Sequence, residues 1–197
     1  KEENLHYFSG FRGDSTVLIV THDRLVLVTD SRYTEQAAVQ APDYEIVEQR
    51  DGLYRKAAEI AADCGVLALG FEGSALVYDA YEKLKELLGE ISFDTSLTLD
   101  RLRQVKDADE IALIRRACAI ADAAFAHILT YIEPGMTELE VAAEMEHFMQ
   151  REGSERPAFQ TIVASGVRGS LPHGVASEKK IARGELVTMD FGAVCMG

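Results

Sequence analysis

Short apolar runs alternate with helix-like stretches through the first hundred residues, and this alternation limits the possible folds most strongly. Residues 15–29 contain two apolar runs separated by His22 and Asp23, which predicts a β-hairpin with a polar turn. A helix capped by Asp30 or Ser31 is then expected as far as about residue 40. Strands are predicted at 44–47, 66–71 and 91–93, of which 66–71 is expected to be buried, with helices at about 53–64 and 74–88. Strands that alternate with helices predict an α/β domain ending near residue 100.

The pattern changes after a charged junction at 99–106. A long helix is expected to begin at Asp107 or Asp109 and to end before Pro134, because apolar residues recur on one stripe. The members of this stripe are Ile111, Ile114, Cys118, Ala121, Phe125, Ile128, Leu129 and Ile132. The sequence Thr-Glu-Leu-Glu at 137–140 is a capping box, which marks the start of another helix.

The second helix is expected to pack through one apolar face, and two strands follow it. The residues predicted to be buried in this helix are Leu139, Ala142, Ala143, Phe148 and Met149. Strands are predicted at 161–164 and 186–193. Two antiparallel helices followed by a sheet are typical of an α+β domain. We therefore expect two domains, an α/β domain at 1–102 and an α+β domain at 103–197.

Composition excludes several classes of function. The chain has 33 acidic and 20 basic side chains, giving a net charge of −13, which disfavours binding to nucleic acids or anionic membranes. No apolar run approaches the length of a membrane span. The three scattered cysteines predict reduced, buried thiols and a cytoplasmic location. Since the chain begins with Lys1 and stops at Gly197 as a strand pair starts, we expect an internal piece of a longer protein.

Two side chains are candidates for chemistry. Asp190 closes an apolar run, where a carboxylate is costly to bury unless a hydrogen-bond donor, a cation or a metal pairs with it. The alternative is that Asp190 caps the following turn. His173 lies on a turn between Pro172 and Gly174, although a lone histidine is more often a surface or structural residue. Serine hydrolysis is unsupported, because the sequence lacks G-x-S-x-G and Ser165 has no evident base.

The sequence as a whole resembles the Xaa-Pro peptidases, which include prolidase and aminopeptidase P. The resemblance rests on IVASG at 162–166, LPHG at 171–174 and GELVTMDFGAVCMG at 184–197, in this order and spacing. Relatives often carry Pro-Asn and a small residue where this chain has Val-Arg-Gly at 167–169. The resemblance implies a creatinase-like α/β N-terminal domain at 1–102 and the first half of an α+β pita-bread domain at 103–197.

The resemblance also implies a mechanism. Family members hydrolyse the Xaa-Pro bond with two divalent metal ions, which can activate a shared water and stabilise both oxygens of the tetrahedral intermediate. Asp190 matches one metal ligand, and four further ligands are expected beyond Gly197. Manganese is the first expectation, with cobalt or zinc as alternatives. His173 matches a histidine that binds no metal but lies near the scissile bond. A homodimer is expected, and the 197 residues alone are expected to be inactive.

Two other functions remain open at the level of the sequence. Some pita-bread proteins have lost their metal ligands and act as protein-binding modules. A creatinase-like amidinohydrolase would share both domains and hydrolyse a guanidino compound without metal, which would leave Asp190 without a role as a ligand. The sequence does not distinguish dipeptides from longer peptides as substrates.

Overall fold

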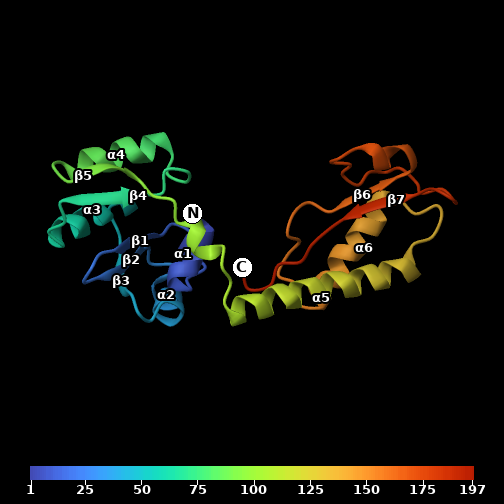
Figure 1. Ribbon diagram of the computed structural model, residues 1–197, viewed down its shortest axis with the longest axis horizontal. Coiled ribbons are helices and arrows are strands. Elements are labelled where there is room, and N and C mark those ends of the chain that lie inside the picture. Colours follow the sequence, from blue (N-terminus) through green and yellow to red (C-terminus); the bar gives the residue numbers. More distant parts are fainter. The chain divides into compact units, whose positions relative to one another are not determined.

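The chain folds into two compact units, residues 1–105 and 106–197. The computed structural model describes residues 1–93 and 95–197 in full, and the backbone of residue 94. In Figure 1 the first unit runs from blue to green and the second from yellow-green to red. The domain limits expected from the sequence lie within a few residues of this division and stay a prediction.

Two small β-sheets form the centre of the first unit. Strands β1 (Val17–Val20) and β2 (Leu25–Thr29) form the antiparallel hairpin that the sequence predicts, and β3 (Glu45–Glu48) runs parallel to β2. The second sheet pairs β4 (Ala68–Phe71) with β5 (Ser92–Ser96) in parallel. Parallel strands that are joined through helices confirm the α/β character of this unit.

Helices cover both faces of the central strand β2. The helical segments of this unit are α1 (Glu2–Ser9), α2 (Thr34–Gln40), α3 (Leu53–Asp63), α4 (Tyr78–Leu88) and η1 (Asp100–Arg103). Val26 and Val28 pack with Ile60 of α3, whereas Leu27 packs on the other face with Phe11 and Ala37. Strand β2 is therefore covered by apolar side chains on both faces.

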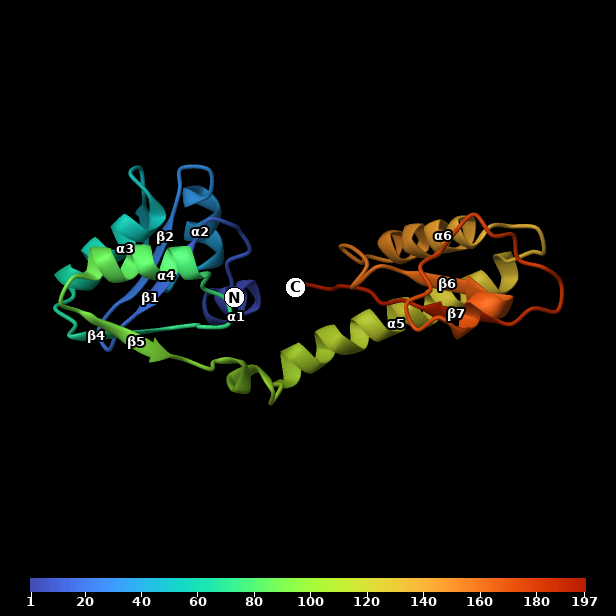
Figure 2. The ribbon, with the colours of Figure 1, turned by 90° about the horizontal axis from the view of Figure 1, so that it is seen from above.

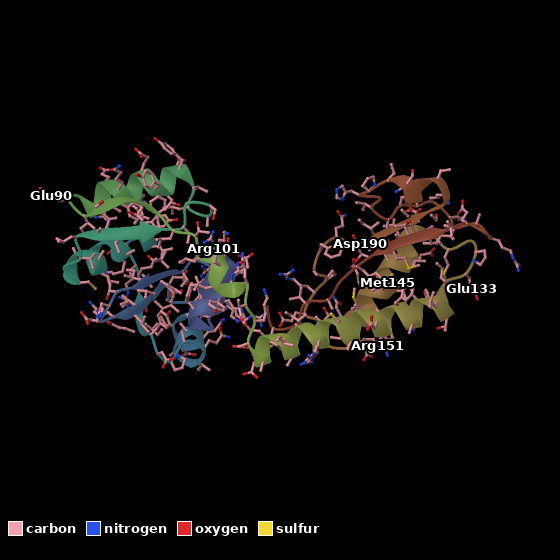
Figure 3. The ribbon with its side chains drawn as sticks, in the orientation of Figure 1. Glu90, Arg101, Glu133, Met145, Arg151 and Asp190 are labelled. Carbon is pink, nitrogen blue, oxygen red and sulfur yellow. The ribbon has the colours of Figure 1, made fainter. Side chains whose placement is uncertain are left out.

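The second unit packs two helices and a two-stranded sheet around one core. Its elements are α5 (Ala108–Tyr131), α6 (Glu138–Arg151), β6 (Ile162–Ser165), η2 (Gly166–Ser170) and β7 (Val187–Asp190). The predicted capping box of α6 is present, and Asp107 forms a second box with Glu110 at the start of α5. Helix α6 packs against both α5 and β6 (Figure 2). Met145 of α6 is fully buried between these elements (Figure 3).

Both long helices bury only some of the residues that were expected to be buried. In α5 the buried side chains are Ile120, Ala124 and Ile128, and only the last of these belongs to the predicted stripe. Leu129, which was expected to be buried, is 60% exposed. In α6, Leu139 and Ala143 are likewise exposed, and the buried side chains are Glu138, Val141, Ala142, Met145 and Met149. Ala142 and Met149 of α6 are buried as predicted, so periodicity found part of the buried face of α6 but largely missed that of α5, because apolar residues lie on more than one face of each helix.

Four smaller expectations are also wrong. Helix α2 begins at Thr34 without a side-chain cap, because Asp30 instead accepts hydrogen bonds from the backbone and side chain of Arg32. Strand β4 is only partly buried. The three cysteines are free, but Cys118 is exposed, Cys64 is half-buried and only Cys195 is buried. Strand β7 ends at Asp190 rather than at residue 193.

No helix among the described residues combines the length and apolarity that crossing a bilayer requires.

Candidate active site

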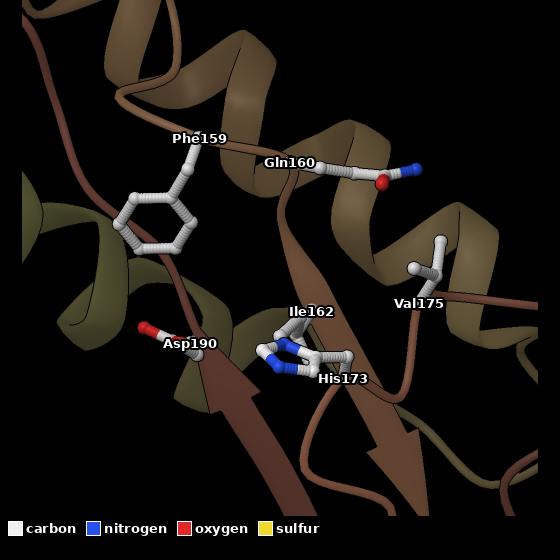
Figure 4. Close-up of a pocket in the computed structure, with 6 residues that line it drawn as sticks. All are labelled: Phe159, Gln160, Ile162, His173, Val175 and Asp190. Carbon is white, nitrogen blue, oxygen red and sulfur yellow. The ribbon is translucent and has the colours of Figure 1, made fainter. Parts of the chain in front are cut away.

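His173 and Asp190, the two residues singled out in the sequence, line the same cavity in the second unit. Its volume is about 420 Å³, and its other lining residues are Phe159, Gln160, Ile162 and Val175. Figure 4 shows Asp190 at the end of β7 and His173 on the loop beside β6, around one opening. A larger cavity of about 970 Å³ lies in the first unit and contains neither candidate residue.

The backbone pairing of Ile162 on β6 determines the positions of both Asp190 and His173. Ile162 pairs with Asp190 of β7 on one side and forms an isolated bridge with Val175 on the other. The backbone N–H of Val175 donates a 2.9 Å hydrogen bond to the carbonyl of His173. The strand register therefore fixes the Asp190 backbone directly, and it fixes the His173 backbone through Val175.

The cavity opens where the pairing between β6 and β7 is interrupted. After Asp190, the two segments pair again only through residues 157–158 and 192–193. There the Ala158 N–H donates a 2.9 Å hydrogen bond to the Gly192 carbonyl, and Pro157 forms an isolated β-bridge with Ala193. Phe159 lies between these two paired regions and lines the opening. This interruption accounts for the early end of β7, and it places Asp190 at the rim of the cavity rather than within a continuous strand.

The turn that carries His173 lies close against β6. Its backbone is held by hydrogen bonds from the Leu171 N–H to the Arg168 carbonyl at 3.0 Å and from the Gly174 N–H to the Leu171 carbonyl at 3.2 Å. A Cβ atom on Gly174 would lie 2.8 Å from the Cβ of Ala164, so this close approach requires glycine. His173 itself is exposed to the cavity. An accessible imidazole can donate or accept a hydrogen bond and can carry a proton.

The Asp190 carboxylate is exposed and makes no hydrogen bond or ion pair among the residues that the structure describes in full. Capping of the following turn, the alternative left open by the sequence, would require the carboxylate to accept a backbone N–H. The geometry therefore leaves the carboxylate oxygens of Asp190 accessible to a cation or a substrate in the cavity.

The described residues supply one fitting metal donor but no complete metal site. No group of three or more His, Cys, Asp or Glu side chains in this part of the chain is arranged to hold an ion. The hard oxygens of Asp190 suit a divalent cation such as Mn²⁺. Two adjacent cations need several carboxylates, however, so Asp190 can be only one member of a larger set of ligands.

Sequence reasoning missed the buried glutamate Glu138. It is the first residue of α6, it is 0% exposed, and its carboxylate accepts five hydrogen bonds. Burial alone would raise its pKa, but hydrogen bonds from Ser177, Ser165 and Arg168 outweigh burial and lower the pKa to about 2. One signal in the sequence could have pointed to Glu138. The capping box needs only Thr137 and Glu140, so a further glutamate between them has no role in capping.

Ser165 is not placed to act as a nucleophile, although Lys179 lies beside it. The Lys179 ammonium donates a 2.8 Å hydrogen bond to the Ser165 hydroxyl, whereas the lysine of a catalytic Ser-Lys pair must be a neutral amine that accepts the hydroxyl proton. The hydroxyl in turn donates at 2.9 Å to the Glu138 carboxylate, and Ser165 is 0% exposed. A substrate cannot reach this oxygen, so the pair belongs to the buried network around Glu138.

Comparison with known proteins connects both units to established families. Residues 1–105 match the Creatinase/Prolidase N-terminal domain, and residues 112–197 match Metallopeptidase family M24. The chain is 40% identical to the uncharacterized peptidase YqhT of Bacillus subtilis, over 98% of this chain and 55% of that protein. It is 38% identical to the Xaa-Pro dipeptidase of Pyrococcus horikoshii, over 98% of this chain and 54% of that protein. The chain thus spans about half the length of these curated relatives.

Solved structures confirm the predicted fold class. An Xaa-Pro dipeptidase from Bacillus anthracis superposes with a TM-score of 0.95 at 42% identity, and the match covers 100% of this chain and 55% of that one. The α/β creatinase-like domain and part of the α+β pita-bread domain are therefore both present. The chain belongs to the family that carries the creatinase/prolidase N-terminal domain, which accounts for residues 1–105, and residues 112–197 match metallopeptidase family M24.

Proposed function

We propose that the whole protein is a metal-dependent peptidase that hydrolyses the peptide bond between any residue and a following proline. The observation that carries this proposal is the shared cavity of His173 and Asp190. Relatives at 37–38% identity that are named Xaa-Pro dipeptidases support the substrate class. Because the chain spans about half of their length, the activity is proposed for the whole protein and not for residues 1–197.

Asp190 is proposed as one metal ligand. Its accessible carboxylate suits Mn²⁺ first, with Co²⁺ or Zn²⁺ as alternatives. When bound, two divalent ions would supply a water of lowered pKa and positive charge next to the scissile carbonyl. The contribution of Asp190 is to hold a negative charge at the cavity rim, where the end of β7 and the pairing with Ile162 fix its position.

His173 is proposed to bind the substrate and to stabilise charge that develops on it. An imidazole N–H beside the scissile carbonyl donates a stronger hydrogen bond as negative charge builds on the oxygen, which lowers the barrier. The apolar side chains of Phe159, Ile162 and Val175 provide a wall for substrate side chains. An Xaa-Pro bond has no N–H to donate, so recognition of the proline must come from shape.

A homodimer in the cytoplasm is the proposed state of the whole protein. The net charge of −13 and the three free cysteines agree with a reducing compartment and with little affinity for anionic surfaces. Sedimentation equilibrium should give twice the mass of one chain. A monomeric mass at micromolar concentration would exclude the dimer.

The proposed activity is tested on the whole protein after loading with Mn²⁺. Four substrates are compared: an Xaa-Pro dipeptide, a longer Xaa-Pro peptide, the same peptide with Xaa-Ala, and creatine as a guanidino compound. We expect cleavage of at least one Xaa-Pro substrate, slower cleavage of Xaa-Ala, and loss of activity on chelation. Residues 1–197 alone should be inactive, because they provide only one matched ligand.

The same assay separates the two other functions. A whole protein that binds peptide but cleaves neither Xaa-Pro substrate would be a binding module, and the proposal would be wrong. Hydrolysis of creatine that survives chelation would indicate a creatinase-like amidinohydrolase. Turnover by residues 1–197 at the rate of the whole protein would require a catalytic site among residues assigned structural roles here.

A further inference from the structure

We propose that Glu138 and Arg168 are positioning residues for His173, an inference that rests on the proposed peptidase function. Neither side chain lines the cavity. Together they hold both ends of the loop at 166–176, which carries His173. They also connect the part of the loop before the His173 turn to the part after it. In this account their effect on the reaction passes through the location of the imidazole.

The Glu138 carboxylate holds the two ends of the loop together. One oxygen, Oε1, accepts from the backbone N–H of Ser165 at 2.7 Å and from its hydroxyl at 2.9 Å. The other, Oε2, accepts from the backbone N–H of Ser177 at 3.1 Å and from its hydroxyl at 2.7 Å. Ser165 directly precedes the loop and Ser177 directly follows it. A single buried charge therefore closes the loop at its base.

Arg168 connects the two arms of the loop to each other and to that charge. Its Nε donates to Glu138 Oε2 at 3.0 Å, and its terminal Nη2 donates at 2.7 Å to the carbonyl of Val175. Arg168 lies before the turn and Val175 lies after it. The guanidinium presents donors in a fixed plane, so it can make both bonds at once, which a lysine ammonium on a flexible stem does less well.

His173 depends on this support because its imidazole has no anchor of its own. Among the fully described residues, its side chain makes no hydrogen bond or ion pair, and its location follows from the backbone of the turn. That backbone is fixed by the Val175 N–H, the contact of Gly174 with Ala164, and the Arg168 carbonyl. Movement of Val175 or Arg168 would therefore move the imidazole relative to Asp190.

Arg168 lies in the Val-Arg-Gly segment at 167–169, within η2. Its side chain connects Glu138 to the carbonyl of Val175. The arginine is 29% exposed, whereas Glu138 is fully buried. Replacing Arg168 thus perturbs the loop with less risk to folding than removing Glu138, which would leave several buried donors without an acceptor.

The test is a double-mutant cycle between Arg168→Met and His173→Ala in the whole Mn²⁺-loaded protein. Methionine keeps most of the apolar stem and removes both donors. We expect Arg168→Met to lower kcat on an Xaa-Pro substrate by about 10- to 100-fold, with KM and metal content unchanged, because misplacement of a transition-state donor affects the chemical step. Arg183→Met is the matched control, since Arg183 is exposed and makes no hydrogen bond to the loop among the described residues; its kcat should equal that of the wild type.

The decisive measurement is kcat of the double variant. If Arg168 acts through His173, then Arg168→Met should change kcat by no more than about twofold once His173 is already alanine. Equal losses in both backgrounds would show that Arg168 supports the structure generally and would overturn the inference. Unchanged kcat in the single variant Arg168→Met would also overturn it. Absence of Xaa-Pro hydrolysis in the wild type would instead refute the proposed function, and this inference with it.

A second variant covers the case in which Arg168→Met does not fold. Ser177→Ala removes one of the five hydrogen bonds to Glu138 and leaves the backbone donor in place. Ser177→Ala alone should lower kcat by less than Arg168→Met does. Combined with His173→Ala, Ser177→Ala should cause no further decrease in kcat. Additive losses in this cycle would overturn the inference equally, provided that thermal unfolding shows both variants to be folded.

Discussion

At the scale of single residues, the charges of the second unit follow one physical rule. The fully buried carboxylate of Glu138 is satisfied by several donors, whereas the carboxylate of Asp190, which has no donor among the described residues, is exposed at a cavity. The first arrangement stabilises the fold, and the second leaves a charge available for binding. The difference explains why two acidic residues in one small unit have unrelated roles.

The lowered pKa of Glu138 predicts a specific dependence of stability on pH. Its folded pKa of about 2 lies below the ordinary value of 4.5, so the ionised form stabilises the fold above about pH 4.5. This stabilisation, on the order of 3 kcal/mol, is lost as the pH falls from about 4.5 towards 2. Thermal unfolding of wild type and Glu138→Gln should therefore differ strongly at pH 7 and much less at pH 2.5.

A control variant makes this pH experiment specific. Glu178→Gln removes an exposed glutamate one residue after Ser177, and its unfolding temperature should follow that of the wild type across the pH range. A difference between wild type and Glu138→Gln that is the same at pH 7 and pH 2.5 would show that the charge of Glu138 is not responsible for its contribution.

The sequence could single out His173 and Asp190 as candidates, but it gave no indication of Glu138. The first two lie on motifs whose order and spacing resemble a known family. The role of Glu138 depends on Ser165 and Ser177, which are 27 and 39 positions away and meet it only in the folded chain. Local reasoning assigned its segment to helix capping, which is correct for Thr137 and Glu140 and says nothing about Glu138.

At the scale of elements, the hairpin and the start of the capped helix α6 were predicted well because their signals are local. A polar turn between two apolar runs defines β1 and β2, and a capping box defines the start of α6. The buried face of α5 was not predicted. Apolar residues lie on several sides of this helix, and Ile128 belongs to the core because it packs in one cluster with Val141 and Met145 of α6.

Substitutions at neighbouring positions of α5 should therefore have very different effects. In the 197-residue chain, Ile128→Ala should reduce the free energy of unfolding by about 2–5 kcal/mol, because it leaves a cavity in a fully buried site. Leu129→Ala, the matched control, should change it by less than about 0.5 kcal/mol, because Leu129 is 60% exposed. Urea unfolding followed by circular dichroism measures both. Equal losses would mean that the stripe expected from the sequence is the buried one.

At the scale of the whole molecule, the chain consists of two units with separate cores. Each apolar cluster lies entirely within residues 1–105 or within 106–197. The alternation of strands and helices in the first part, and the two long helices in the second, made this division predictable. The limits at 1–102 and 103–197 remain a proposal, since a charged segment joins the two parts without a sharp signal.

Limited proteolysis should cut the junction at 99–106 before any other region. Val105 is 84% exposed, and both Arg101 and Lys106 are exposed sites for trypsin. The N-terminal fragment should keep its circular dichroism spectrum, because its core is complete without the second unit. First cleavage at Arg24, within the hairpin, would contradict the division into independently folded parts.

The central claim is that Asp190 holds metal and that His173 acts on the substrate without holding metal. Its most direct test is the metal content of the whole protein, measured by elemental analysis for Asp190→Asn and His173→Ala beside kcat on an Xaa-Pro substrate. We predict that Asp190→Asn loses bound Mn²⁺, whereas His173→Ala keeps the wild-type content and loses about 10²–10³-fold in kcat. Loss of metal from His173→Ala, or full metal content in Asp190→Asn, would contradict this division of roles.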